Sequence, residues 1–381
     1  MTDWKSSLRS DPMPWLLENG SPAIRYRVLT ELLELGRENP DVQKARQDML
    51  EYEPALKLVK AQKKSGTWGT RISAGESRKD YVSMEHAMHM LLEYGWNRET
   101  APVKLAAKLL RTYLTQKKDM QFFEFTKEVK ADPRQEKYFR WFFRILALEL
   151  LVRTGYDDNR SRIAIMELLE LTSGFVDLPG SRNPTEEIGA NHPLIRHEVW
   201  NRGYPFIPDL YLTRVFACSP WLLNGEMAKM RLKKIYDYVM SPTYQNLAPG
   251  LGLVKTAKGS FLKGNGIKFH PLEHYQKSGH VDEMLMNLEM FARLGLVNRY
   301  PLLMNHIDWV YSQQGRDGRW SLSTKLYSDS SRWTELQRVE KDWRSPTRKE
   351  VDMTFRLLLI MKNQWERQMQ MLDRRDDGYP I

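Results

Sequence analysis

Glycines close four apolar helical runs of this chain at regular intervals. They are Gly36, Gly95, Gly155 and Gly295, and intervals of 59 and 60 residues separate the first three. The last interval of 140 residues would hold two longer repeats, with the missing helix end near 217–219. A glycine after an apolar run is typical of a helix C-cap, because glycine enters the left-handed conformation without a steric penalty. Helix ends at a constant period predict a repeated helical unit.

Each glycine lies between two helical patterns. Around Gly95, apolar residues recur at spacings of three and four from Met84 to Leu92 and again from Ala101 to Leu110. Alternating β-branched runs are nearly absent. These patterns predict an all-α chain of about six antiparallel helix pairs. The first helices of the pairs are expected near 22–35, 80–94, 138–154, 206–218, 281–294 and 347–362.

The first helix of each pair is unusually apolar. The run from Tyr138 to Phe143 is apolar around most of its circumference, which is typical of a helix buried on all sides. This favours an inner ring of first helices within an outer ring, an α/α toroid, over an open solenoid. We expect one domain over 1–381, with repeats from about 22 to 362 and a polar C-terminal tail over 363–381. Long loops are expected at the Gly- and Pro-rich stretches 172–205 and 240–270.

Composition narrows the class of protein. The formal net charge is +10, but acidic and basic residues interleave, which predicts a solvated basic surface, with an anionic small ligand, nucleic acid or a membrane face as alternatives. The single cysteine, Cys218, excludes an internal disulfide. No apolar stretch approaches the roughly 20 residues of a membrane span, and the N-terminus lacks a signal peptide's basic start and apolar centre.

We therefore expect a cytoplasmic protein. A small apolar molecule is its expected partner, there is no clear nucleic-acid signal, and peripheral membrane contact stays open. The sequence contains no phosphate loop or dinucleotide fingerprint, so no cofactor is predicted.

Two loops share the pattern Q-x-x-x-G-x-W, at 62–68 and 314–320, and Trp309 stands upstream of the second. The pattern resembles the QW motif of squalene–hopene cyclases and related terpenoid cyclases, and the similar repeats of protein prenyltransferase β-subunits. The opening Pro14-Trp15-Leu16 and the Ser21-Pro22 helix start look like bacterial squalene-cyclase-like proteins of unassigned activity. The resemblance spans most of the chain and implies the α/α toroid. In each loop we expect the glutamine to cap a neighbouring helix end, the glycine to make the turn and the tryptophan to stack beneath it.

The motifs that carry the chemistry of those families are absent. There is no D-x-D-D motif, whose central acid protonates an alkene in class II cyclases, and no D-D-x-x-D motif for magnesium diphosphate. No D-x-C precedes Cys218, as the prenyltransferase zinc site requires. The resemblance implies a terpene-cyclase-like reaction and leaves open whether this chain performs one.

An inner ring would direct the N-termini of its helices to one mouth, where they attract anions. Basic residues near these helix starts would hold a diphosphate or carboxylate above an apolar cavity, and aromatic rings lining that cavity would stabilise a cation. The alternatives are surface arginines and ordinary core packing. The predicted ligand-binding residues are Arg140, Arg202 and Arg344 with the aromatic residues Tyr81, Trp141, Phe142, Tyr204, Tyr211 and Tyr275.

Two acids stand near the starts of inner helices, beside aromatic residues. They are Asp209 and Asp282. A buried carboxyl there would have a raised pKa and could serve as a general acid. The alternative is an ordinary N-terminal acid favoured by the helix dipole.

Two short motifs suggest other chemistries. His270 and His274 form an H-x-x-E-H pattern, the inverted zinc motif, with Glu350 as a distant third ligand. A chance match is the alternative, because proteases with that motif have a mixed α/β fold. Asn191 and His192 resemble the Asn/His pairs of α/α-toroid polysaccharide lyases.

Three hypotheses follow for function. The first is binding, and cyclisation or rearrangement, of an isoprenoid or other apolar ligand with an anionic group. The second is a carbohydrate-active toroid enzyme of the polysaccharide-lyase type. The third is a non-catalytic binding or interaction module.

Overall fold

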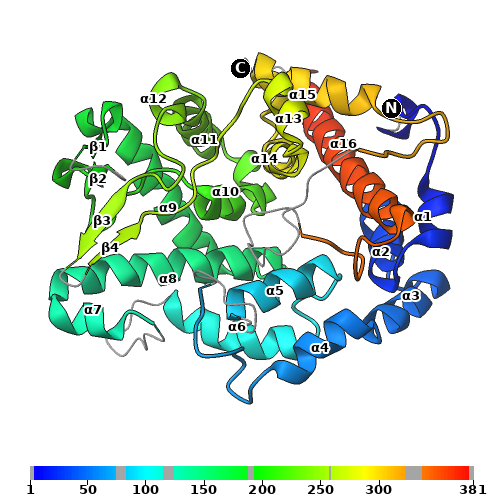
Figure 1. Ribbon diagram of the computed structural model, residues 1–381, viewed down its shortest axis with the longest axis horizontal. Coiled ribbons are helices and arrows are strands. Elements are labelled where there is room, and N and C mark those ends of the chain that lie inside the picture. The colour runs from blue at the N-terminus through cyan, green and yellow to red at the C-terminus, as the bar shows by residue number, and fades with distance from the viewer. Residues whose placement is uncertain are drawn as a thin grey trace. The chain divides into compact units, whose positions relative to one another are not determined.

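The structure is a computed structural model, mostly helical, that divides by residue contacts into two compact units (Figure 1). Unit 1 consists of residues 1–62, 86–97 and 270–381, and unit 2 of residues 63–85 and 98–269. The residues that the structure describes are 4–73, 83–114, 124–187, 193–256, 259–322 and 337–376. Tyr81, Asn191 and His192 lie outside them.

Unit 1 is built of helices from the beginning and the end of the chain. Its elements are η1 (Trp4–Ser7), α1 (Met13–Asn19), α2 (Pro22–Arg27), η2 (Val28–Leu32), α3 (Pro40–Leu50), α4 (Glu53–Ala61), α13 (Leu272–Ser278), α14 (Val281–Arg293), η6 (Val297–Arg299), α15 (Pro301–Ser312) and α16 (Pro346–Asp376). Helix α5 (Met84–Glu93) contributes residues to both units.

Unit 2 combines helices with four short strands. Its elements are α6 (Ala101–Tyr113), α7 (Thr126–Ala131), α8 (Pro133–Arg153), α9 (Asn159–Asp177), η3 (Pro179–Arg182), β1 (Thr185–Glu186), β2 (Leu194–Ile195), η4 (His197–Val199), α10 (Leu210–Ala217), η5 (Pro220–Asn224), α11 (Glu226–Val239), α12 (Pro242–Gln245), β3 (Leu253–Thr256) and β4 (Gly259–Leu262).

Three of the four predicted glycine caps share one geometry. Gly95, Gly155 and Gly295 have φ angles of +86°, +88° and +69°. Each glycine N–H donates to the carbonyl three residues earlier, at 3.0 to 3.1 Å, and the next N–H donates to the carbonyl five residues before it, at 2.9 to 3.1 Å. This pair of bonds is the Schellman motif. The structure therefore confirms these three helix ends, and α10 ends at Ala217, where the missing one was expected.

The first of the four predicted glycine caps, at Gly36, is not present, and that prediction is wrong. Residues Val28–Leu32 form a π-helical turn, in which the Leu33 N–H donates to the Val28 carbonyl at 2.9 Å. The positive φ, +54°, falls on Glu34. Because the π-helical turn ends the helix at Leu33, the left-handed residue comes two positions before Gly36.

The expected first helices correspond to α2 with η2, α5, α8, α10, α14 and α16. In α10 and the part of α16 over 351–361 nearly all residues are buried, and in α14 and the described part of α8 most are. The second helix α6 buries only one face, with Val103, Ala106 and Leu110 at spacings of three and four. Within unit 2, α8 packs against α6 and α10, and α9 packs against α11. Within unit 1, α16 packs against α14, α1 and η2.

A buried ion network joins the first helices of unit 1. Arg27 of α2 and Arg356 of α16 each place a guanidinium nitrogen 3.0 and 2.9 Å from Glu93 of α5. Arg356 also lies 3.0 Å from Glu289 of α14. Segments from the beginning, middle and end of the sequence are therefore held together in this unit. Every charge has an opposite partner, which offsets the cost of removing it from water.

The two predicted long loops are partly ordered into one small sheet, which the near absence of β-branched runs did not predict. Its strand order is β1-β2-β3-β4. β2, from the first loop, pairs in parallel with β3, from the second, and the other pairings are antiparallel. Both loops thus meet in unit 2.

The two Q-x-x-x-G-x-W loops are structurally equivalent. In each loop the N–H of the second motif position donates to the carbonyl of the sixth, at 2.8 Å, and the glycine N–H donates to the carbonyl of the second position, at 2.8 and 3.0 Å. Gly66 and Gly318 have φ angles of +87° and +82°. Trp68 and Trp320 are 1% and 0% exposed. The predicted turn and buried tryptophan are confirmed in both copies.

The glutamine of the second loop has a different role from the one expected. The Gln314 amide donates to the carbonyls of Gly318 and Ser10, at 2.9 and 3.1 Å, and accepts from the Arg9 N–H at 2.8 Å. It therefore ties its own loop to the segment before α1, where we expected it to cap a neighbouring helix end.

The predicted polar tail begins as helix. α16 continues through 363–376 to Asp376, because residues after Leu359 keep a helix-forming polar and apolar mixture without glycine or proline. Among the helices that the structure describes, none has the length and apolar character needed to cross a membrane.

Candidate functional site

Asp282 is a buried acid at the start of α14. It is the second residue of that helix and is 1% exposed. No described residue donates a hydrogen bond to its Oδ1. Burial raises the pKa of Asp282 above the ordinary 3.8, although the N–H groups of Asp282 and Glu283 and the nearby His280 act in the opposite direction. The pKa of Glu283 is raised as well, by burial and by the charge of Asp282.

Asp209 is the N-cap of α10, directly before the first helical residue, and both of its carboxyl oxygens have partners. Its Oδ1 accepts from the Leu212 N–H at 2.9 Å, which caps the helix. Its Oδ2 lies 2.5 Å from the Lys263 ammonium, which stands 4.9 Å above the ring of Tyr204. Asp209 and Lys263 are 1% and 2% exposed. Asp209 thus has the helix-terminal role that was the alternative to acid chemistry.

Most of the predicted cavity-lining aromatic residues pack against other rings. In unit 2, Trp141 meets Phe206 edge to face at 5.1 Å and Tyr204 stacks on Tyr138 at 5.1 Å. In unit 1, Tyr275 is fully buried and its hydroxyl accepts from the His270 N–H at 3.1 Å. These contacts are those of core packing, the alternative interpretation.

Phe142 and Tyr211 have a more polar setting. Phe142 is half-buried, 6.4 Å from the ring of Tyr211. The Tyr211 hydroxyl donates to Glu85 at 2.8 Å. Burial and then the Glu85 carboxylate raise the pKa of Tyr211 well above its ordinary value.

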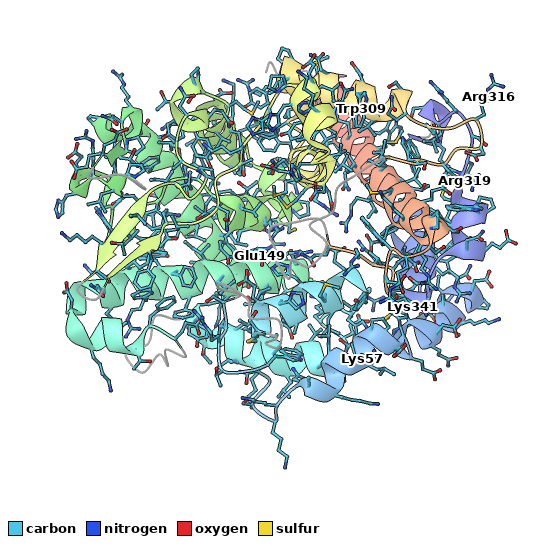
Figure 2. The ribbon with its side chains drawn as sticks, viewed as in Figure 1. Lys57, Glu149, Trp309, Arg316, Arg319 and Lys341 are labelled. Atoms are coloured by element: carbon cyan, nitrogen blue, oxygen red, sulfur yellow. The ribbon has the colours of Figure 1, made fainter. Side chains whose placement is uncertain are left out.

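Glu85 and Glu149 belong to a buried polar cluster of unit 2 that the sequence reading missed. Both are 0% exposed, and Glu149 is labelled on α8 in Figure 2. Arg153 lies 3.6 Å from Glu149. Burial lowers the pKa of Arg214, and the Glu149 carboxylate opposes that effect. The available signal was a glutamate within the otherwise apolar stretch 145–152 of a first helix, at Leu148-Glu149-Leu150.

Of the predicted basic residues, Arg202 and Arg344 are exposed, whereas the Arg140 side chain is only 17% exposed. Arg140 pairs with Glu136 on the preceding turn of α8 at 2.5 Å, and Arg202 lies 3.2 Å from Glu167. Since Arg140 and Arg202 are in unit 2 and Arg344 is in unit 1, a common mouth stays a prediction.

The H-x-x-E-H motif lies at the start of a helix, a position that tolerates its proline, but its two histidine rings are not arranged around a common metal position. α13 begins at Leu272, directly after Pro271. The His270 and His274 rings lie 4.1 Å apart at 30°, which is nearly stacked, and Glu350 is 3.4 Å from Arg319. No group of three or more potential metal ligands occurs among the described residues.

No family model matches this sequence, and no curated protein or solved structure is significantly similar to it.

Proposed function

We propose that the chain forms a terpenoid-cyclase-like α/α toroid of about six helix pairs. The equal Schellman caps of three pairs, the equivalent Q-x-x-x-G-x-W loops and the buried first helices support this arrangement. The contact of α16 with α1 and η2 is what a closed ring requires of its two ends.

We further propose that this toroid binds an isoprenoid-like apolar ligand bearing an anionic group and starts its cyclisation or rearrangement by protonation. Asp282 is the proposed proton donor. The observation that carries the proposal is its setting: a carboxyl 1% exposed, with a raised pKa, at the start of a first helix. A carboxyl of this kind keeps its proton to higher pH than an exposed aspartate and can act as a general acid.

The proposed step is balanced by one proton. The Asp282 O–H bond breaks, the proton forms a C–H bond with the π electrons of an alkene, and a carbocation and the Asp282 carboxylate result. Loss of a proton from the rearranged carbocation forms a new alkene and returns the molecule to the charge of the substrate, and reprotonation of Asp282 restores the enzyme.

The test measures ligand retention and product formation separately. Native mass spectrometry against prenyl diphosphates and squalene-like polyenes detects retention, and gas chromatography of extracts detects products. We expect Asp282→Asn to retain the ligand and to lose about 10²- to 10⁴-fold in turnover, the usual contribution of a general acid.

Glu283→Gln is the matched control, because it removes the neighbouring carboxyl whose pKa is also raised. It should retain most of the turnover. Equal turnover in Asp282→Asn and the unaltered protein would exclude Asp282 as donor. Retention of a ligand without any product would leave the non-catalytic binding module as the function.

A further inference from the structure

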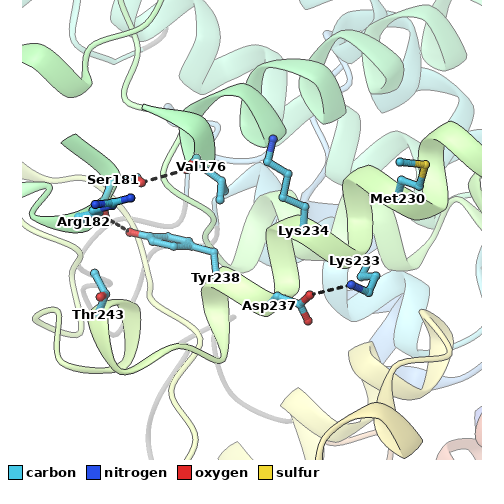
Figure 3. Close-up of a pocket in the computed structure, with 9 residues that line it drawn as sticks. All are labelled: Val176, Ser181, Arg182, Met230, Lys233, Lys234, Asp237, Tyr238 and Thr243. Carbon is cyan, nitrogen blue, oxygen red and sulfur yellow. Dashed lines mark hydrogen bonds and ion pairs between the residues drawn. The ribbon is translucent and has the colours of Figure 1, made fainter. Parts of the chain in front are cut away.

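Unit 2 has a surface pocket with a volume of about 650 Å³, and neither Asp209 nor Asp282 lines it (Figure 3). Its walls come from the end of α9, from η3, from α11 and from α12. The volume falls within the range of about 300–1,000 Å³ that is usual for small-molecule sites. All lining residues belong to one unit, so the pocket is complete within it.

The wall around η3 is held by hydrogen bonds. The Tyr238 hydroxyl donates to the Ser181 carbonyl at 2.9 Å, and the Ser181 hydroxyl donates to the Val176 carbonyl at 3.0 Å. The Tyr238 ring also packs edge to face on Phe175 and Tyr244, at 5.6 Å each. The backbone that carries Arg182 is therefore fixed before any ligand arrives, which lowers the entropy cost of binding.

Positive charge predominates in the lining. Arg182, Lys233 and Lys234 line the pocket with a single acid, Asp237. Lys233 lies 3.4 Å from Asp237 and Lys234 pairs with Asp177, all at partly exposed positions. Such pairs contribute only about 0–1 kcal/mol, so the lysines can exchange these partners for a doubly charged anion. Arg182 is exposed and has no ion-pair partner among the described residues.

The remaining lining is apolar. Val176, the Tyr238 ring and Met230 face the pocket, and Met230 is 62% exposed. Methionine adapts its shape to apolar ligands. Figure 3 shows Arg182 and Tyr238 at one side and Met230, Lys233 and Lys234 along α11 at the other. The pocket thus offers a planar guanidinium and two ammonium groups next to an apolar surface.

We propose that this pocket binds a phosphate monoester with an apolar body. Arg182 bonds the phosphate in a bidentate manner, the Tyr238 ring beside it and Met230 on the opposite wall cover the apolar part, and the two lysines of that wall attract the anion from across the pocket. Asp282 belongs to the other unit and does not line this pocket.

Titration calorimetry with three soluble probes tests this proposal. We expect 1-naphthyl phosphate to bind more tightly than inorganic phosphate and than 1-naphthol, because only the ester contacts both the basic groups and the apolar surface of the pocket. Arg182→Gln should weaken binding of the ester at least tenfold, and since Arg182 is exposed the fold should be unaffected.

Sedimentation with phosphatidic acid vesicles distinguishes a lipid headgroup from a soluble ester. Capture of the protein by the vesicles that depends on Arg182 identifies the lipid as the source of the phosphate.

Arg160→Gln is the matched control. Arg160 is also exposed on α9 but stands 16 residues before Val176, roughly 24 Å along the helix, and its loss should leave binding unchanged. The proposal is overturned by equal weakening in both variants, which indicates diffuse attraction to a basic surface. It is also overturned if 1-naphthol binds as tightly as the ester, or if no probe shows saturable binding.

Discussion

Asp209 and Asp282 are two equally buried acids at helix starts, yet their surroundings differ. Asp209 is the N-cap of α10, Asp282 is the second residue of α14, and each is 1% exposed. Asp209 has the Lys263 ammonium at 2.5 Å and caps α10. Asp282 has only nearby N–H groups and His280 to favour its charge, and burial outweighs them. Burial therefore does not decide what an acid does, because a single buried cation converts a candidate proton donor into a structural ion pair.

The same substitution should have opposite results at the two positions. Asp209→Asn keeps a capping oxygen but leaves the Lys263 ammonium buried without its counter-ion, so we expect the free energy of unfolding to fall by about 3–5 kcal/mol. Urea denaturation measures the change. The double variant Asp209→Asn with Lys263→Met removes both charges and should recover most of the loss. If the double variant were as unstable as Asp209→Asn, the ion pair with Lys263 would not be the reason why Asp209 stabilises the fold.

Asp282→Asn should not lower stability at neutral pH, and its effect should depend on pH. Because the folded pKa of Asp282 is raised, the native state binds more protons than the unfolded state between the two pKa values. The free energy of unfolding of the unaltered protein therefore decreases as pH rises through that window. The asparagine variant lacks this contribution, so the difference between the two proteins should grow with pH from about 4 upward. Parallel curves would indicate an ordinary, solvated carboxyl.

A smaller effect is expected from giving Asp282 a cation like that of Asp209. His280 lies close enough to lower the pKa of Asp282, and His280→Lys would place a permanent charge there. A nearby charge lowers a carboxyl pKa by about 1, so turnover at neutral pH should fall about tenfold. His280→Gln introduces no permanent charge and serves as control. A rate that is the same in both variants would show that the charge state of Asp282 does not limit the reaction.

The helices and most of their ends could be predicted from sequence because their signals are local. Apolar spacing and the glycines at 95, 155 and 295 specify helix faces and helix ends, and each acts through residues within one or two turns. Gly36 failed because a π-helical turn at Val28–Leu32 ends the helix early. The small sheet was missed because β2 and β3 pair across about 60 residues and are too short to show alternation.

The candidate site was less accessible to sequence reasoning. The positions of Asp209 and Asp282 could be recognised, but their different partners could not, because Lys263 is 54 residues from Asp209 along the chain. Tyr211 was identified as an aromatic residue, whereas its bond to Glu85 connects two helices distant in sequence. The 650 Å³ pocket likewise joins α9, η3, α11 and α12, and no local pattern marks it.

The most direct test of the account is a carboxyl ¹³C NMR titration of Asp282, assigned with the Asp282→Asn variant. We expect a midpoint clearly above the ordinary 3.8, since burial outweighs the N–H groups and His280 around this carboxyl. A midpoint at or below 3.8 would contradict it, because Asp282 would then be an ordinary carboxylate at the start of α14 with no proton to donate.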